Sequence, residues 1–472
     1  MAEHETAVDV AVVGGGPAGL SAALTLAEGG LRVAVVDEAG ELGGQYFKRR
    51  AEPIAAALGD FRPEGTVLVR RVRDAGVRCL THTLVWGASD GAGTLFTSDV
   101  RTGAPGRVTA RRVVVATGAI ERAGAFPGWS LPGVVTPGFA MHLATMDRTP
   151  VGRRVVLAGT GSFLLPVARA LIEVGVRVVE LLEYNHPYRP RPAALGALRH
   201  PARLREAAGY LLALAGHGVR VRQGWRVLAA HGTPGGDRVR AVDIGPVGGR
   251  VARRVEVDAL CVGFGFRPST ELPRLLGCLT RTDPASGEEL PVVDRAGATS
   301  VPGVHVVGEA AGVAGVHAAL IRGKLAAYRV LGDLGGAPVP ARRLTAAGRR
   351  ARALDRFAAL SERLYPVPPE LATSLADETP VCRCEGVTAG EVRRAAERGW
   401  NDPQSAKGAT RAGMGPCQGR ECGHLVAALA GRAGGARAFT ARMPLRPIPV
   451  ATAAALDDTG RLDAGPTAEE DA

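Results

Sequence analysis

Near the amino terminus the hydrophobic positions follow the order strand, helix, strand. Residues 8–13 have the short apolar pattern of a buried strand, and residues 20–28 continue as a helical run. A second strand pattern, residues 31–36, ends at Asp37. Since a helix commonly carries the chain between two parallel strands, this order predicts a βαβ unit.

The turn between the first strand and the helix has the pattern G-x-G-x-x-G, formed by Gly14, Gly16 and Gly19. In a βαβ unit such glycines permit a tight turn, close approach of the backbone to a pyrophosphate and close packing of helix on strand. The helix amino terminus then faces the phosphates, and an acid at the position of Asp37 accepts hydrogen bonds from the ribose. The pattern predicts a dinucleotide site; a glycine turn without a ligand is the alternative.

A second unit of the same kind begins at Arg153. Leu164 occupies its third glycine position, and Glu183 stands one place later than Asp37 does in the first unit. Two interpretations stay open: a second nucleotide, NAD(P) or ATP, or a structural relic of a duplicated domain. The unit comprises an apolar run at residues 155–158, a turn with Gly159 and Gly161, a helix to residue 174 and a strand from residue 176.

Three further buried segments end in small residues. They are residues 113–119, 259–268 and 304–312, and a helix follows the last of them from about residue 316. We expect all three to belong to the first domain, so that the second unit is inserted within it.

Four of the seven cysteines lie close together in the last third of the chain: Cys382, Cys384, Cys417 and Cys422. Their spacing is C-x-C, thirty-two residues, then C-x-x-x-x-C. In a cytosolic chain such a group indicates a metal site before it indicates disulfides, and four thiolates suit zinc or an iron–sulfur cluster. The C-x-C pair and the surrounding glycines favour the cluster, with zinc as the alternative.

The net charge of +12 does not predict a nucleic-acid partner. Only Lys48, Lys324 and Lys407 are lysines, and the arginines are scattered rather than interleaved with aromatic residues as in a binding groove. No apolar run of about 18 residues lacks a charge, and no basic stretch precedes an apolar one at the amino terminus. We expect no nucleic acid, no membrane-spanning segment and a cytoplasmic chain, with membrane association through partners left open.

The order GGGPAG, Asp37, ATG, a second G-x-G unit and VVGE before a helix resembles the glutathione-reductase-like flavoproteins. These are α/β proteins with two Rossmann-like dinucleotide-binding domains, and the resemblance implies FAD in the first one. Glu309 stands where the family has Asp. The residues implied to bind FAD are Gly14, Gly16, Pro17, Ala18, Gly19, Asp37, Glu38, Gly44, Gln45, Ala116, Thr117, Gly118, Gly308 and Glu309; Gly159, Gly161 and Glu183 are those for a second nucleotide.

Disulfide reductases of this class carry a pair of redox cysteines beside the flavin. Here the segment after Asp37 holds no cysteine, and Cys261 and Cys278 are too far apart in sequence to form such a pair. We expect these two to be small buried hydrophobic residues. A thioredoxin or glutathione reductase is excluded.

The cysteine segment resembles the 2Fe–2S domain named for bacterioferritin-associated ferredoxin. Together, GGQYFKR, ATGAIERAGAFPGWSLPGVVTPG, LAGTGSFLLPVA, CVGFGFRPSTEL and VCRCEGVT…RAGMGPCQGRECG resemble the α (A) subunits of opine oxidases, D-hydroxyproline and L-proline dehydrogenases and hydrogen cyanide synthase. The resemblance implies an oxidoreductase subunit with FAD and a 2Fe–2S cluster held by the four cysteines. It also implies a partner flavoprotein like D-amino-acid oxidase, sometimes with a small ferredoxin-like subunit.

We therefore expect a subunit of a dehydrogenase complex that oxidises an opine, hydroxyproline, proline or glycine and passes electrons to an acceptor. An NAD(P)H-dependent flavin and iron–sulfur reductase and a non-catalytic electron-relay scaffold are the alternatives, and no catalytic base is assigned. The two cofactor sites are expected to be independent because they lie in separate domains, and residues 457–472 have the composition of a disordered tail. The expected divisions are 1–150 (FAD-binding domain, first part), 151–255 (inserted NAD(P)-like domain), 256–335 (FAD-binding domain, second part), 336–375 (connector), 376–435 (2Fe–2S domain) and 436–472 (C-terminal tail).

Overall fold

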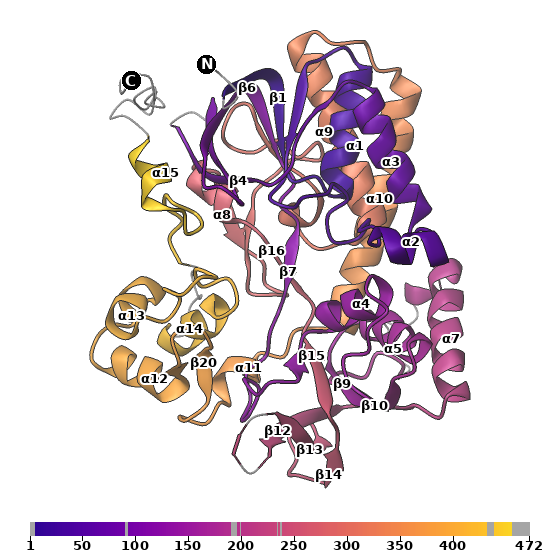
Figure 1. Cartoon of the computed structure of the whole chain (residues 1–472), viewed down its shortest axis with the longest axis vertical. Coiled ribbons are helices and arrows are strands. Elements are labelled where there is room, and N and C mark those ends of the chain that lie inside the picture. The colour runs from indigo at the N-terminus through magenta and orange to yellow at the C-terminus, as the bar shows by residue number, and fades with distance from the viewer. Residues whose placement is uncertain are drawn as a thin grey trace, which may run out of the picture.

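The computed structural model describes residues 5–455, apart from 90–92, 190–195, 199, 234, 237 and 432–438. The expected disordered tail, residues 457–472, lies outside the described residues. Figure 1 shows two α/β bodies stacked along the long axis, with the cysteine-bearing domain packed beside them. None of the helices within the described ranges is both long and apolar enough to cross a bilayer.

The first body is built on a seven-stranded sheet in the order β3-β2-β1-β6-β5-β4, with β19 paired to β6. β1, β2, β3, β6 and β19 run parallel, whereas β4 and β5 add an antiparallel edge. The strand pattern at residues 8–13 is the buried end of β1, as expected. The strands are β1 (Glu5–Val13), β2 (Val33–Val36), β3 (Arg78–Leu80), β4 (Thr83–Ala88), β5 (Thr94–Asp99), β6 (Pro105–Val115) and β19 (Val304–Val306).

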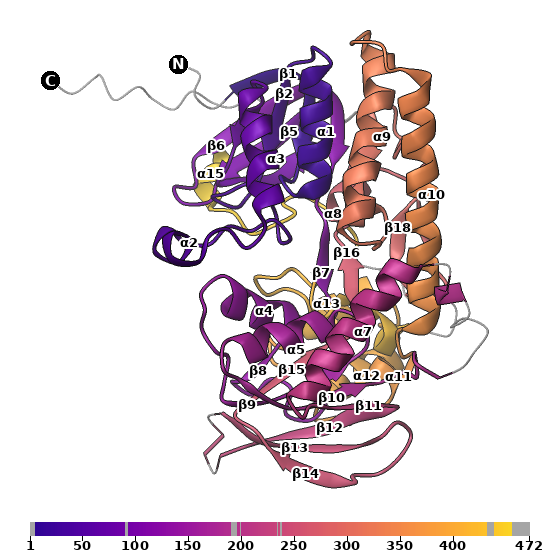
Figure 2. The ribbon, with the colours of Figure 1, turned by 90° about the vertical axis from the view of Figure 1, so that its right-hand side faces the viewer.

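Helices α1 and α9 pack against each other on this sheet, and α10 lies along α9 (Figure 2). α10 is the expected connector, and it runs from the first body down beside the second. The helices of the first body are α1 (Pro17–Glu28), α2 (Glu52–Leu58), α3 (Pro63–Asp74), α8 (Glu271–Leu275), the 3-10 helix η2 (Gly308–Ala311), α9 (Val316–Leu334) and α10 (Ala341–Leu364), with a hairpin of β17 (Thr280–Thr282) and β18 (Glu289–Pro291).

The second body has a parallel sheet in the order β11-β10-β9-β15-β8. An antiparallel sheet, β12-β13-β14, lies beside it. Its elements are β8 (Val134–Val135), α4 (Pro137–Thr145), β9 (Arg154–Gly159), α5 (Leu164–Glu173), β10 (Arg177–Glu183), α7 (Pro201–Gly216), β11 (Arg220–Gln223), β12 (Trp225–Gly232), β13 (Val239–Pro246), β14 (Arg253–Glu256) and β15 (Ala259–Gly263).

The expected limits of the inserted domain, residues 151 and 255, are wrong at both ends. β15 pairs with β9 from Ala259 to Gly263, so this strand belongs to the second sheet and not to the first domain. β8 pairs with β15, and α4 packs on α5, so the insertion begins well before residue 151. The buried strand β9 needs a partner on each side for its backbone groups, and β15 provides the one opposite β10.

A two-stranded ribbon, β7 (Ala119–Glu121) and β16 (Phe266–Pro268), joins the two bodies. The cysteine-bearing domain packs beside this ribbon, and its hydrophobic core is continuous with that of the second body. Trp129 donates its indole N–H to the carbonyl of Pro380 at 2.6 Å across this junction. The elements of the domain are α11 (Glu370–Thr373), β20 (Pro380–Cys382), β21 (Val387–Thr388), α12 (Ala389–Glu397), α13 (Pro403–Thr410) and α14 (Gly423–Ala430).

The described part of the expected tail is not free. Residues 439–455 return to the first body and end in α15 (Val450–Ala454). The Thr452 hydroxyl donates to the carbonyl of Gly103 at 2.5 Å, and the amide of Leu445 donates to the carbonyl of Trp86 at 2.8 Å. The segment therefore packs as part of the first domain.

Glu288 lies between two buried arginines beside the ribbon. Its carboxylate is 2.6 Å from Arg122 and 2.7 Å from Arg267, and the three side chains are 9%, 4% and 11% exposed. Burial acts to raise the pKa of Glu288, but the two guanidinium groups outweigh it and lower that pKa. The carboxylate is thus ionised in the fold and compensates two cations.

Replacing this carboxylate tests how much the junction contributes to stability. Glu288→Gln should lower the free energy of unfolding by about 3–5 kcal/mol, because it leaves two buried guanidinium groups without a counter-charge. Urea unfolding followed by tryptophan fluorescence measures the change. The control is Glu64→Gln, which removes an exposed partner of Arg62 and should cost less than about 1 kcal/mol. Equal small losses in both variants would contradict a stabilising junction.

Candidate functional site

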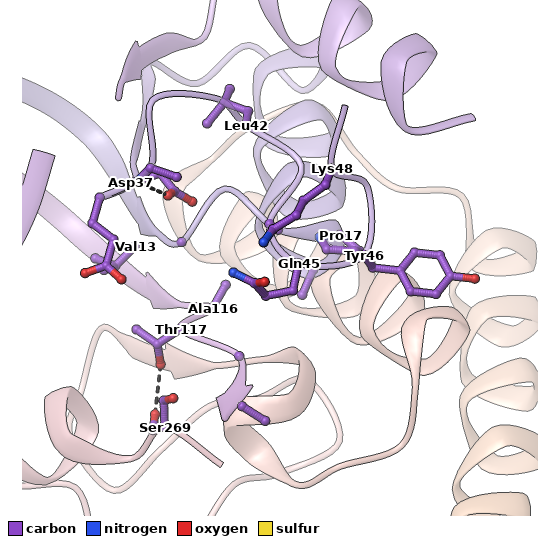
Figure 3. A pocket seen from close by; sticks show the side chains of 18 of the residues that line it. Val13, Pro17, Asp37, Leu42, Gln45, Tyr46, Lys48, Ala116, Thr117 and Ser269 are labelled. Carbon is purple, nitrogen blue, oxygen red and sulfur yellow. Dashed lines mark hydrogen bonds between the residues drawn. The ribbon is translucent and has the colours of Figure 1, made fainter. Parts of the chain in front are cut away.

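A cavity of about 680 Å³ opens where β1 and β2 end, within the size range of cofactor pockets. Figure 3 shows Gln45 and Lys48 reaching into it from the loop after Asp37, while the ring of Tyr46 points away. All the residues expected to bind FAD line this cavity except Gly19 and Gly308. Those two pack the fold instead: a Cβ on Gly19 would lie 1.9 Å from the carbonyl oxygen of Gly14, and one on Gly308 would lie 2.7 Å from Ala18 Cβ.

Gly16 differs from the other glycines of the turn. Gly14 has φ +106° and lies against the carbonyl of Ala116, so a side chain there would clash within the protein. Gly16 has φ −79° and caps α1, and the nearest atom to a Cβ built on it is Gly44 Cα at 3.8 Å. The protein itself would tolerate a side chain at Gly16. A bare backbone at this helix amino terminus fits the close approach of a phosphate.

Two half-buried carboxylates, Asp37 and Glu309, face the cavity, and neither forms a salt bridge with another described residue. Asp37 accepts hydrogen bonds from the amides of Gly15 at 2.6 Å and Ala39 at 2.8 Å, and Glu309 accepts one from Gly315 at 3.3 Å. Burial raises the pKa of both side chains, against the effect of these amides. Each carboxylate retains lone pairs that can accept hydrogen bonds from ligand hydroxyls.

Three polar residues in a chain of contacts on the cavity wall were not predicted from the sequence. Lys48 Nζ lies 3.5 Å from His142 Nδ1, and His142 Nε2 lies 3.6 Å from Asp147. Burial lowers the pKa of Lys48 and of His142. Lys48 falls in the GGQYFKR segment, which was a usable signal, but nothing in the sequence places α4 and its His142 against this loop.

Two arginines from the C-terminal third also line the cavity and were missed. Arg446 is 3.2 Å from Glu38, and Arg420 is 3.5 Å from Glu271 at the start of α8. Arg420 stands between the last two cysteines of the metal motif. The loop that carries these cysteines therefore reaches the cavity of the first domain.

The structure brings the four expected cysteines together as free thiols in a row of contacts, Cys384 to Cys417 to Cys422 to Cys382. Hydrogen bonds, first of all from the Cys422 thiol, lower the pKa of Cys382 to about 6 and that of Cys417 to about 5. Thiolates are the form that ligates metals.

Within the described ranges, no three His, Cys, Asp or Glu side chains are arranged to hold one metal ion. Four thiols brought together in this way suit the four ligands of a 2Fe–2S cluster or of a zinc ion.

Glycines bring the cysteine loops close to one another. A Cβ on Gly415 would lie 2.3 Å from Cys384 Cβ, and the amide of Gly413 donates to Cys382 Sγ at 3.4 Å. Gly413 and Gly419 have φ +82° and +78°, and a Cβ on either would meet the ring of Phe439. A capping box of Thr388 and Glu391 begins α12. Of the three remaining cysteines, Cys261 and Cys278 are buried, as expected, and Cys79 is half-buried.

The second glycine turn is closed by its own acid. Glu183 is buried and accepts hydrogen bonds from the Thr160 hydroxyl at 2.7 Å and the amides of Gly161 at 3.1 Å and Asn185 at 2.9 Å. Asn185 in turn donates to the carbonyl of Pro366 in the connector at 2.9 Å. The amide of Gly161, the counterpart of Gly16 in the first turn, is therefore already used within the protein.

Comparison with known proteins gives the family. Residues 8–323 match the pyridine nucleotide-disulphide oxidoreductase family, and residues 380–431 match the BFD-like [2Fe-2S] binding domain. The A-subunit of opine oxidase from Rhizobium meliloti (strain 1021) is 36% identical over 93% of this chain and 97% of its own length. Hydrogen cyanide synthase subunit HcnB of Pseudomonas protegens is 30% identical over 93% of this chain and 96% of its own. This chain belongs to the opine oxidase A-subunit family.

Membership confirms the family, the fold class and the two cofactors expected from the sequence, FAD and a 2Fe–2S cluster. A solved L-proline dehydrogenase from P. horikoshii has the same fold, with a TM-score of 0.69 at 22% identity over 95% of this chain and 80% of that one. The cavity and the cysteine row fit the two cofactors. Of the described residues that line the cavity, none is a cysteine, in agreement with the exclusion of a disulfide reductase.

Gly16 separates ligand binding from folding. Gly16→Val should give a folded protein that binds no FAD, because its side chain has room in the protein but occupies the position of the pyrophosphate. Flavin absorbance after purification measures FAD binding, and far-UV circular dichroism with a thermal melt measures folding. Gly209→Val is the matched control, since Gly209 also has open space but lies on α7, away from the cavity. Normal flavin content in Gly16→Val would show that FAD binds elsewhere.

The closed second turn gives a prediction about reductants. NADH and NADPH should leave the flavin of the purified chain oxidised, because Glu183 occupies the amide that a nicotinamide nucleotide would need. Anaerobic absorbance spectra, with dithionite as the positive control, measure this. Rapid bleaching of the flavin by either nucleotide would restore the NAD(P)H-dependent reductase as the function.

Proposed function

We propose that this chain is the FAD- and 2Fe–2S-containing subunit of a complex that dehydrogenates an amino or imino acid. The candidate substrates are an opine, hydroxyproline, proline or glycine. The chain relays electrons from a partner flavoprotein, similar to D-amino-acid oxidase, to an acceptor. Two relatives support this, since their names describe subunits of an opine oxidase and of a hydrogen cyanide synthase.

One observation carries the proposal: the loop between Cys417 and Cys422 contributes to the wall of the flavin cavity. When bound, FAD exchanges electrons in pairs or singly and a 2Fe–2S cluster exchanges them one at a time. A chain that places these two sites side by side suits electron transfer between a carrier of electron pairs and a carrier of single electrons.

We assign the binding residues accordingly. The amino terminus of α1 at Gly16 binds the pyrophosphate. The carboxylate of Asp37 accepts hydrogen bonds from the ribose, and that of Glu309 accepts hydrogen bonds from the ribityl–pyrophosphate region. Lys48 holds positive charge at the cavity wall. The full assignment for FAD is Gly14, Gly16, Pro17, Ala18, Asp37, Glu38, Gly44, Gln45, Ala116, Thr117, Gly118 and Glu309, and the cluster ligands are Cys382, Cys384, Cys417 and Cys422.

The domains divide along the sheets and not at the limits expected from the sequence. We assign residues 5–118 and 269–334 to the FAD-binding domain and residues 122–264 to the inserted domain. The inserted domain acts as a structural support, because Glu183 and Asn185 connect its glycine turn to the connector at Pro366. Substrate oxidation is placed in the partner.

Activity with and without the partner tests this division of labour. The purified chain should reduce a dye acceptor little or not at all with proline, hydroxyproline, glycine or an opine, and co-expression with its partner flavoprotein should restore turnover. Cys384→Ser should lower turnover while the substrate still reduces the partner's flavin, because the variant loses a cluster ligand. Cys79→Ser, which changes a cysteine remote from the cluster, is the control. Full activity from the single chain would refute the proposal.

A further inference from the structure

Arg420 belongs to two sites at once. It lies between Cys417 and Cys422 in the cluster loop, and its side chain, 14% exposed, forms part of the wall of the flavin cavity. Its guanidinium Nε is 3.5 Å from Glu271 Oε1, at the first residue of α8. A cluster loop in another conformation would withdraw this charge from the cavity.

The backbone of the same residue is fixed as well. The carbonyl of Arg420 accepts a hydrogen bond from Arg267 Nη1 at 2.7 Å, and Arg267 also holds Glu288. Arg267 belongs to β16, which pairs with β7, and Ala119 of β7 lines the cavity. These contacts link the position of the cluster loop to that of the ribbon of β7 and β16, which lies beside the flavin site.

The charge of Arg420 matters because acidic side chains that line the cavity are neutralised by arginines. Arg49 pairs with Glu41 at 3.0 Å, and Arg446 pairs with Glu38 at 3.2 Å. Arg420 forms the corresponding pair with Glu271 at 3.5 Å. Without Arg420, Glu271 would present an uncompensated negative charge to a cofactor whose pyrophosphate is itself anionic.

We propose that Arg420 is a positioning residue that couples assembly of the cluster to binding of FAD. Ligation of Cys417 and Cys422 holds the loop in the form that places the guanidinium against Glu271, and this completes the cavity. Because coupling between two binding sites is reciprocal, each cofactor raises the affinity of the chain for the other by the same factor. Loss of either cofactor would then weaken binding of the other by about tenfold.

This inference rests on the proposed function, since it takes FAD as the occupant of the cavity. It replaces the expectation that separate domains make the two sites independent. If the parent chain binds no FAD, or if Gly16→Val binds it normally, the site assignment fails. If both behave as expected, the variants below test the coupling alone.

The first test changes the charge of Arg420. In the chain stripped of flavin and holding its cluster, Arg420→Met should weaken FAD binding by about tenfold, as expected for the loss of a charge that compensates a neighbouring acid. Arg420→Lys keeps the charge and should recover most of the affinity. Quenching of flavin fluorescence on titration gives both dissociation constants.

Arg383→Met is the matched control. Arg383 lies between the other two ligands, Cys382 and Cys384, pairs with Glu421 at 3.3 Å and packs over the Trp129 ring, but it does not line the cavity. The Arg383→Met variant removes the same charge from beside the cluster and should leave the affinity for FAD unchanged. An unchanged affinity in Arg420→Met, an equal loss in Arg383→Met, or no recovery in Arg420→Lys would overturn the proposal.

A double-mutant cycle tests the connection itself. Cys417→Ser, which loses the cluster, should weaken FAD binding about as much as Arg420→Met, and the double variant should be no weaker than either one. Iron analysis confirms that the cluster is absent from the Cys417→Ser variants. Losses that multiply in the double variant, or an unaltered FAD affinity in Cys417→Ser, would show that the two sites are independent and would overturn the coupling.

Discussion

Arg267 brings a buried positive charge to the place where three parts of the chain meet. A buried guanidinium is costly unless it is paired and hydrogen-bonded, and here Glu288, the carbonyl of Arg420 and His424 share that task. His424 Nε2 donates to the carbonyl of Ala123 at 3.2 Å, so its Nδ1 is free to accept from Arg267 at 3.2 Å. Burial, first of all, lowers the pKa of His424 and keeps it neutral for this role. One set of bonds thus fixes the ribbon, the hairpin of β17 and β18, and the cluster domain relative to one another.

The consequence for function is that the cluster loop lies against the wall of the flavin cavity. Its carbonyl is held by Arg267 and its side chain by Glu271, so the cysteines lie beside the flavin cavity and not at the end of a mobile domain. The second dinucleotide domain contributes rigidity in the same way. Its acid, Glu183, binds its own glycine turn, and Asn185 extends that network to the connector. These contacts hold the inserted domain, the connector and the cluster loop in fixed positions relative to one another.

Local patterns predicted much of this from the sequence. The glycine turn, Asp37 and the four cysteines lie where spacing placed them, because each depends on a few residues that are close in sequence. Arg420, Arg446 and His142 were missed as cavity residues, since they reach it from distant parts of the chain. The domain limits failed for a similar reason: β8 has only two residues and no pattern, and the pairing of β15 with β9 follows from which strand edge is open. Long-range pairing of this kind leaves no periodic signal in the sequence.

If electrons pass from a partner through this chain to an acceptor, the cluster in the assembled complex must become reduced when substrate is added. An oxidised 2Fe–2S cluster gives no electron paramagnetic resonance signal, whereas a cluster reduced by one electron does. Samples of the complex frozen anaerobically after addition of the amino-acid substrate should show the reduced cluster, and samples of the chain alone with the same substrate should not. A cluster that stays oxidised in the complex while the substrate reduces the partner's flavin and a dye is turned over would contradict the account.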